Sequence, residues 1–380
     1  MNAGPMKADL ITDLGGIPAI EEDWRRLAEL RGNAFVTPEW FVSWWAHEGG
    51  SSTPLIVAVR RSDGSLAGVM PLVLDSSTRP HSVRFAGGGL GDRFHPAARP
   101  EDGPEVGEVA MAALEDAGLS RRMLLLEKVD VELEFWRRMK AGARRALAAI
   151  ELQKAPMPYA TLEGLDWDGY LAQRRGKFRG ELRRRDRVLR RDHDVRFRIA
   201  DDSTFEADLA ELLRLHDLRW RRASSLSNPK RREAVRAFAA AARRRGWLRL
   251  GVLEVDDAPV AATLCWRVGD AYSGYQGGFD PAWGKRSVGI LLVAHMIRNA
   301  IEEGATEFDF LLGAEDYKRG FTSTARTATT LALIGSLAPS RMLVACEVGA
   351  RRVARRMRSR PGVGRLLRPL AHNLPVAGAD

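Results

Sequence analysis

A chain of 380 residues exceeds what one ordinary hydrophobic core supports, so its length favours two domains of roughly 150 residues each. Its two cysteines, Cys265 and Cys346, lie far apart, which argues against a disulfide scaffold or a structural zinc site and is typical of a reducing cytoplasm. The net charge of +10 is concentrated in two arginine-rich segments, 174–191 and 341–368. The rest of the chain is slightly acidic, which does not suit a protein that binds nucleic acid over its whole surface.

In the N-terminal half we predict a helix over 21–30 and a second helix that begins at Pro38, behind the capping residue Thr37. A hairpin with strands over 55–60 and 66–74 follows. The other elements expected here are a strand over 82–86, a helix over 105–115, a strand over 123–128 and a helix over 133–150. The start of the chain has no signal-peptide pattern, and no apolar run is long enough to span a membrane, so we expect a soluble, cytoplasmic protein.

The second half is predicted to begin with one long helix over 167–191, because Leu171, Phe178, Leu182 and Leu189 fall on one helical stripe. The elements expected after it are helices over 205–221 and 229–245, strands over 248–255, 260–268 and 271–277, a helix over 287–303, and strands over 307–312 and 329–334.

An internal repeat relates the two halves. A constant shift lays Ile56–Val59 on Leu250–Leu253 and Leu66–Gly68 on Val260–Ala262. Both hairpins follow two helices and precede further strands. We interpret this as the duplication of one α/β unit; the alternative is a chance similarity between two β-hairpins.

The segment 275–289 joins the third strand of the second half to the following helix and suits an anion. A helix N-terminus presents unpaired N–H groups and the positive end of the helix dipole. Gly284 and Gly289 permit close backbone approach, and Lys285 and Arg286 add positive charge. These features favour a pyrophosphate; the alternative is an ordinary capped helix. No Walker lysine pattern and no GxGxxG after a parallel strand occurs, so ordinary nucleotide-binding folds do not fit.

These residues resemble a known family. The run Asp280–Gly289, Leu291-Leu292 and then Glu307–Phe310 after Gly304 is similar to the acetyl-CoA-binding core of GNAT acetyltransferases. A closer resemblance is to the double-GNAT proteins of the cellulose-biosynthesis (BioF2-like) type, which are related to the Fem aminoacyl-transferases of peptidoglycan synthesis. The residues that carry it are Phe308–Leu311, Glu315–Lys318, Phe35–Trp40, and Leu215-His216 with Arg219-Trp220. It extends over about residues 30–335.

The resemblance implies an α/β (α+β) fold with two tandem GNAT-like domains, each a mixed, mainly antiparallel sheet flanked by helices. We expect the domains at 1–155 and 156–336, followed by a basic C-terminal helix and tail at 337–380. It also implies acetyl-CoA or another acyl-CoA as co-substrate. The residues expected to bind it are Tyr275, Gln276, Gly277, Gly278, Gly284, Lys285, Arg286, Ser287, Val288 and Gly289. Ser287 and Val288 depart from the spaced glycines that the family usually has at this point.

Acyl transfer requires a base for the acceptor, donors for the thioester oxygen and a proton for the leaving thiolate. Asp309 is one candidate base, because it alternates with Phe308 and Phe310 and so points to the other face of its strand; Glu315 is the second. Tyr317 is the candidate proton donor to the sulfur, with simple packing as the alternative. The residues expected to contact the acceptor are Asp92, His216, Arg219 and Lys318. No His, Cys and carboxylate cluster has metal-ligand spacing, so no metal is expected.

The favoured function is an acyl-CoA-dependent N- or O-acyltransferase that acts on a sugar, polysaccharide precursor or other small acceptor bound between the domains. Two alternatives stay open: a Fem-like aminoacyl-tRNA-dependent transferase in cell-envelope synthesis, for which tRNA would be a partner, and a non-catalytic CoA-binding protein.

The arginines of 174–191 predict either a solvated helix or a phosphate-rich partner. Arg341–Arg358 forms a basic amphipathic pattern, which predicts packing against the domain or peripheral contact with the inner membrane face.

Overall fold

The computed structural model describes residues 4–335 except 78–80, 119–121, 144–146 and 221–223. The predicted basic helix and tail at 337–380 therefore lie outside the described residues. The strands of the N-terminal half are β1 (Lys7–Ile11), β2 (Ser52–Arg60), β3 (Leu66–Asp75), β4 (Ser82–Phe85), β5 (Ala97–Ala98), β6 (Met123–Asp130) and β7 (Leu147–Thr161). Its helices are α1 (Glu21–Leu30), α2 (Pro38–Glu48), α3 (Gly103–Asp116) and α4 (Glu134–Ala141).

The C-terminal half repeats this alternation of helices and strands. Its strands are β8 (Val195–Ile199), β9 (Leu248–Val255), β10 (Ala258–Val268), β11 (Ala271–Phe279), β12 (Glu307–Asp309) and β13 (Ala325–Gly335). Its helices are α5 (Trp167–Ala172), α6 (Gly176–Asp192), α7 (Phe205–Trp220), α8 (Pro229–Arg244), α9 (Val288–Glu302) and α10 (Lys318–Phe321). Among the described residues, no helix combines the length and apolarity needed to cross a membrane.

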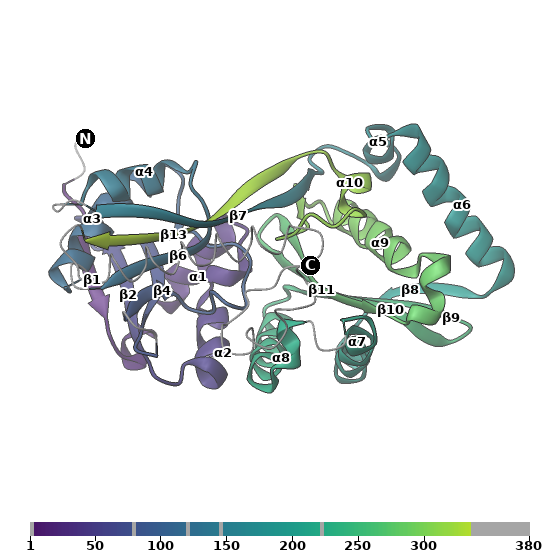
Figure 1. The fold of residues 1–380 in the computed structure, drawn as a ribbon, viewed down its shortest axis with the longest axis horizontal. Coiled ribbons are helices and arrows are strands. Elements are labelled where there is room, and N and C mark those ends of the chain that lie inside the picture. The colour runs from purple at the N-terminus through teal and green to yellow at the C-terminus, as the bar shows by residue number, and fades with distance from the viewer. Residues whose placement is uncertain (1–3, 78–80, 119–121, 144–146, 221–223, 336–380) are drawn as a thin grey trace, which may run out of the picture.

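The strands of the described residues form one 13-stranded, mainly antiparallel sheet in the order β1-β2-β3-β4-β6-β13-β7-β12-β11-β10-β9-β8, with β5 beside β3. Two parallel contacts, β4 with β6 and β11 with β12, occupy the same place in each half. Each half thus consists of an antiparallel meander followed by a helix and a parallel strand, which agrees with the repeat seen in the sequence. Helices cover both faces of the sheet in each half (Figure 1).

The two halves exchange their last strands. β13 pairs along its whole length with residues 147–158 of β7. The end of β7, Tyr159 to Thr161, pairs with β12, whereas β13 also pairs with β6. In Figure 1 the two strands run side by side across the top of the molecule, from one half to the other. The predicted boundary at residue 155 consequently falls inside β7, in a strand that both halves share.

Two predicted helices are wrong. The helix expected over 133–150 ends at Ala141, and the alanine-rich stretch after it is the first part of β7, because pairing with β13 outweighs its local helix propensity. The helix expected over 167–191 is broken into α5 and α6 at Arg174 and Arg175, where the guanidinium of Arg174 donates to the carbonyl of Phe321. The start of α2 is as expected: the Thr37 hydroxyl accepts from the backbone N–H of Trp40, and Pro38 occupies the first turn.

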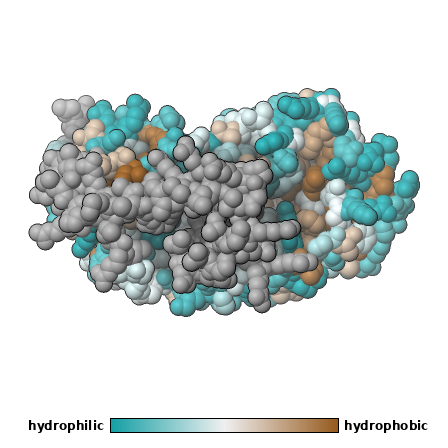
Figure 2. Space-filling view, in the orientation of Figure 1, coloured by the Kyte–Doolittle hydropathy of each residue, from teal (hydrophilic) through white to brown (hydrophobic). Residues whose placement is uncertain are grey.

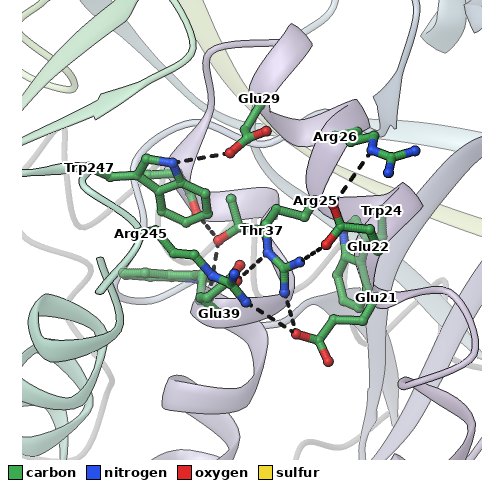
Figure 3. Close-up of polar contacts among 12 residues, drawn as sticks. Glu21, Glu22, Trp24, Arg25, Arg26, Glu29, Thr37, Glu39, Arg245 and Trp247 are labelled. Atoms are coloured by element: carbon green, nitrogen blue, oxygen red, sulfur yellow. Dashed lines mark hydrogen bonds and ion pairs between the residues drawn. The ribbon is translucent and has the colours of Figure 1, made fainter. Parts of the chain in front are cut away.

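The interface between the halves is apolar at its centre and polar at its edge. One hydrophobic core runs through both halves, and in it Trp40 of α2 packs edge-on against Phe238 of α8, with ring centroids 5.1 Å apart. At the edge, Glu39 accepts from Arg25 (2.5 Å) and from Arg245 (2.9 Å), as Figure 3 shows. A shared core and bridging ion pairs fix the halves relative to one another, which positions any site built between them.

Candidate active site

A cavity of about 410 Å³ opens where β11 and β12 part. The two strands are parallel neighbours only from Ala271 to Ser273, opposite Glu307 to Asp309, and then diverge. A β-bulge at Tyr275 sharpens the divergence, because Leu264 pairs with Gln276 and Cys265 with Gly274. Backbone groups of β11 beyond Ser273 therefore face the cavity without a neighbouring strand, which leaves them available to an extended ligand.

The N-terminus of α9 closes one end of the cavity. A short 3₁₀ turn, Pro281–Arg286, leads into it, started by the Asp280 carboxylate that accepts from the N–H of Ala282 at 2.9 Å. Ser287 then adopts the left-handed conformation, with φ of 59°, and turns the chain into the helix. Gly284 and Ser287–Gly289 line the cavity, so the helix directs its N-terminal N–H groups and positive dipole end at it.

Of the predicted phosphate ligands, Lys285 and Arg286 do not line the cavity. Lys285 is exposed, and Arg286 forms an ion pair with Asp192 at the end of α6, at 2.7 Å. The backbone of the loop and the helix terminus, rather than these two side chains, face the cavity. The remaining expected acyl-CoA ligands, from Tyr275 to Gly278 together with Gly284, Ser287, Val288 and Gly289, all belong to the lining.

Helix α7 forms a second wall and depends on Gly278. A Cβ at Gly278 would lie 2.2 Å from the backbone nitrogen of His216, so only glycine allows α7 to approach β11 this closely. The Trp220 indole N–H donates to the carbonyl of Gly277 at 3.0 Å and locks this contact. Arg219 lines the cavity with its guanidinium over the rings of Trp220 (4.4 Å) and Phe279 (4.8 Å).

His216 lies behind this wall and does not line the cavity. Its Nε2 lies 3.2 Å from Oε1 of Gln276 and 3.1 Å from the hydroxyl of Ser224. Burial lowers the pKa of His216 to about 4, so the imidazole is neutral at pH 7. His216 therefore does not reach the cavity itself, and it contacts Gln276, which does line the cavity.

The segment after β12 brings three predicted residues to the cavity. Leu311 and Gly313 have positive φ angles of 57° and 123°, and this turn directs Glu315, Tyr317 and Lys318 into the lining. The Lys318 ammonium donates to the carbonyl of Leu312 (2.9 Å) and forms an ion pair with Glu315 (2.8 Å). Burial raises the pKa of Tyr317, with the Glu315 carboxylate adding to the effect, so the phenol stays protonated at neutral pH.

Asp309 does not join this group. It is fully buried, but it is absent from the cavity lining, to which its neighbours Phe308 and Phe310 belong. On the opposite face of β12 its carboxylate forms ion pairs with Arg93 (3.3 Å) and Arg326 (3.7 Å) and accepts from the backbone N–H of Leu311 (2.8 Å). The face that Asp309 occupies is therefore the one away from the cavity. The predicted role of Asp309 as a base would therefore require a substrate on the other face of β12.

The N-terminal half contributes Asp92 to the cavity. In this half the segment after β4 returns into the gap between β4 and β6, where Phe94 bridges to Val129. The same segment carries Asp92 into the lining of the C-terminal cavity, where Lys128 holds its carboxylate at 3.1 Å. The carbonyl of Leu90 accepts from the Tyr275 hydroxyl at 3.0 Å and fixes the loop to β11.

Cys265 is a lining residue that sequence reasoning did not select. Burial raises the pKa of its thiol to about 12, so no thiolate is present at neutral pH and a nucleophilic role is disfavoured. Trp220 and Phe279, which stack on Arg219, were also not predicted as site residues. Among the described residues, no group of three His, Cys, Asp or Glu side chains is placed to hold a metal ion.

Comparisons with known proteins agree with this geometry. Residues 176–319 match the family profile described as an acetyltransferase (GNAT) domain. The structure is similar to that of FemX (TM-score 0.62, 11% identity, 89% of this chain and 99% of FemX). It is also similar to the C-terminal domain of a protein from Agrobacterium fabrum described as a putative lysylphosphatidylglycerol synthetase (0.56, 13%, 89% and 96%) and to L-PGS from Bacillus licheniformis (0.54, 14%, 90% and 96%).

At such identities the likeness to solved structures bears on the fold alone. A comparison with curated proteins finds no match. The fold is thus the predicted one, a GNAT-like α/β arrangement with a large, mainly antiparallel sheet flanked by helices. The profile match, which contains most of the cavity lining, supports a transferase.

Proposed function

We propose that the chain is an acyl-CoA-dependent N- or O-acyltransferase of the cellulose-biosynthesis-type double-GNAT branch, acting on a sugar, a polysaccharide precursor or another small acceptor. One observation carries this proposal: a single cavity combines the free edge of β11, the N-terminus of α9 and Asp92 from the other half. The first two suit an acyl-CoA, whose pyrophosphate needs N–H donors and whose pantetheine amides need a strand edge. The third brings an acceptor-facing group from across the interface.

In the proposed complex the pyrophosphate lies against Gly284 and Ser287–Gly289, and the pantetheine arm follows β11 toward Tyr275. A pyrophosphate at this place gains from the helix dipole and the backbone N–H groups without requiring Lys285 or Arg286. Arg219 has no carboxylate partner among the described residues and faces the same cavity, so it suits an anionic part of either substrate.

A matched pair of substitutions at Ser287 tests this donor site. Asp and Asn both tolerate the left-handed backbone of this position and both cap helices, but only Asp adds a negative charge where the pyrophosphate is proposed. We expect Ser287→Asp to weaken acetyl-CoA binding by about 1–3 kcal/mol in calorimetric titration, the size of the repulsion between two like charges a few ångströms apart near a protein surface. Ser287→Asn should bind almost like the parent chain. Equal affinities for the two variants would show that the pyrophosphate lies elsewhere.

The proposed chemistry is a direct transfer. The acceptor amine or hydroxyl attacks the thioester carbonyl carbon while Glu315 takes its proton. The C–S bond then breaks, and Tyr317 gives its proton to the departing thiolate. Solvent exchange returns the proton from Glu315 to Tyr317 and restores both groups. Glu315 is the candidate base because it lines the cavity, whereas Asp309 does not. Tyr317 is the candidate acid because it is protonated and lines the same cavity.

The base is tested by Glu315→Gln, which keeps the shape of the side chain and removes its ability to take a proton. We expect kcat to fall by about 10²–10⁴-fold, the usual contribution of a general base, with acetyl-CoA binding retained. Asp316→Asn is the matched control, because Asp316 is exposed and, within the described part of the chain, forms an ion pair with Arg319 alone. Since the substitution at Glu315 deprives Lys318 of its carboxylate partner, unfolding by denaturant should be measured alongside. Undiminished turnover in a folded Glu315→Gln variant would remove Glu315 from the mechanism.

The exposed arginines of α6 favour an aminoacyl-tRNA-dependent transferase as the second candidate function. α6 buries only Leu182 and Leu189, and most of its arginines are exposed. Figure 2 shows a largely hydrophilic surface along the edge where Figure 1 places this helix. Several of these arginines pair with Glu181 and Asp186, which reduces the charge available to a nucleic acid. Tight, salt-sensitive binding of charged tRNA without any affinity for CoA thioesters would favour this candidate, and CoA binding without turnover would indicate a binding protein.

A further inference from the structure

A second cavity, of about 590 Å³, lies between the two halves at the opposite end of β11 and β12. It begins where α1 ends and where β11 and β12 start, whereas the first cavity begins where these strands part. Residues of both halves and of the exchanged strand β13 form its wall. Its charged lining residues include Arg31, Arg93, Glu307 and Arg326.

Three guanidinium groups converge on this cavity, but only two of them form ion pairs with the two nearby carboxylates. Arg326 pairs with Glu307 through both of its terminal nitrogens, at 2.9 Å for one of them, and approaches Asp309 at 3.7 Å. Arg93 lies 3.3 Å from Asp309 and 3.8 Å from Glu307. Arg93 and Arg326 therefore share both carboxylates, and neither carboxylate forms an ion pair with Arg31.

Arg31 differs from the other two guanidinium groups in this cavity. Within the part of the chain that the structure describes, no side chain or carbonyl accepts a hydrogen bond from its guanidinium, although the residue is more than half buried. It directly follows α1, whose C-terminal end supplies only a fractional negative charge. Burial, and then repulsion by Arg93 and Arg326, lowers the pKa of Arg31. A partly buried cation without a counter-charge among the described residues is unfavourable, which makes this position suited to an anionic ligand.

The other charged groups around the cavity do not supply that partner. Arg26 is directed at Glu22 and Asp23, and Glu29 accepts from the indole N–H of Trp247 at 3.2 Å (Figure 3). Asp270 is exposed at the rim. Behind the wall, burial and the nearby arginines lower the pKa of His95 far below its usual value, so that ring stays neutral.

We propose that this second cavity binds an anionic group, a phosphate or a carboxylate, with Arg31 as its principal ligand and Arg93 and Arg326 completing the site. A guanidinium presents a planar fork of donors that matches two oxygens of either group. A bound anion would give Arg31 the counter-charge that the described residues do not provide. The site is separate from the proposed donor cavity and does not depend on the identity of the acyl donor.

The two cavities are linked through adjacent residues. Asp92 lines the first cavity and Arg93 lines the second, so one loop of the N-terminal half reaches both. An anion that draws Arg93 away from Asp309 would act on the loop that carries Asp92. Any such coupling is reciprocal: the anion would change acceptor binding, and the acceptor would change anion binding by the same factor.

The test is calorimetric titration of the full chain with inorganic phosphate and, separately, with citrate. We expect saturable binding of at least one of them, weakened tenfold or more by Arg31→Gln. Binding should be unchanged by Arg137→Gln, the control, because Arg137 is exposed and lines neither cavity. Binding of phosphate alone would assign a phosphoryl ligand, and binding of citrate alone a carboxylate ligand. The Ser287→Asp variant should retain this binding, which separates the second site from phosphate held at the N-terminus of α9.

Arg31→Lys keeps the charge but loses the fork, and an intermediate affinity is expected for it. Absence of saturable binding of both anions to the parent chain, or equal binding by the parent and Arg31→Gln, would overturn the proposal. Acetyl-CoA affinity should be the same in Arg31→Gln as in the parent. If neither anion binds at the second cavity, the acyltransferase proposal still stands. If acetyl-CoA does not bind, the phosphate and citrate titrations still test the second cavity.

Discussion

Replacing Tyr317 with phenylalanine is expected to reduce kcat by about 10²–10⁴-fold, the usual range for a lost general acid, while the Kd for acetyl-CoA stays nearly constant. The phenol lines the cavity, and burial beside Glu315 keeps it protonated. A thiolate that leaves without a proton is a poorer leaving group, so the substitution should slow the chemical step and leave acetyl-CoA binding unchanged. Because the pKa of Tyr317 is raised, the parent enzyme should not lose this proton donor in the neutral range, and its turnover should not fall there on that account.

The matched control is Tyr272→Phe. Tyr272 lies on the same strand as Tyr275, is fully buried and accepts from the Asn299 amide at 3.0 Å, but it does not line the cavity. Its loss should lower the free energy of unfolding by about 1 kcal/mol, as for a typical hydrogen bond, and leave kcat unchanged. Equal effects of the two substitutions on kcat would mean that Tyr317 acts through packing alone.

The second large effect is structural, at the interface between the halves. Trp40 is 2% exposed and contacts Phe35 (4.9 Å between ring centroids), Phe238 (5.1 Å) and Tyr275 (6.3 Å). Truncation of a buried tryptophan to alanine typically costs about 3–5 kcal/mol, so Trp40→Ala should lower the denaturation midpoint strongly. Because Tyr275 loses a neighbour, the bulge of β11 should loosen and acetyl-CoA binding should weaken as well.

Val42→Ala is the control for the interface, since Val42 lies on the same helix and is 49% exposed. Its free energy of unfolding should stay close to that of the parent, as for most surface substitutions. If Trp40→Ala unfolds in two separate transitions, the halves are held together mainly by this residue. A denaturation midpoint in Trp40→Ala equal to that of Val42→Ala would contradict the shared core.

The sequence allowed the order of most elements to be predicted, because hydrophobic period, caps and hairpin turns are local signals. The Thr37 cap, the hairpin β2–β3 and the amphipathic α9 are examples. β7 could not be predicted in this way. Its alanine-rich start has the local preference of a helix, and only pairing with β13, far away in the chain, makes it a strand. Exchange between the halves is a non-local property, so the boundary at residue 155 could not be refined from local signals.

In the candidate site, too, local signals predict some features, whereas other features depend on residues far apart in the sequence. The loop before α9 was recognisable because glycines and a helix start follow each other in the sequence, and its backbone does line the cavity. The roles of Arg286 and Asp309 were not recognisable, since they depend on Asp192, Arg93 and Arg326, each distant in sequence. Alternation showed that Asp309 points away from Phe308, but it could not show which face holds the cavity.

The most direct test of the central claim is hydrogen–deuterium exchange of the full chain with and without acetyl-CoA. We expect acetyl-CoA to slow amide exchange at residues 274–279 and 284–291, the free edge of β11 and the start of α9. The corresponding segment of the N-terminal half, 82–89, should exchange at the same rate in both samples. Protection confined to 82–95, or no protection anywhere at saturating acetyl-CoA, would contradict a donor site in the C-terminal half.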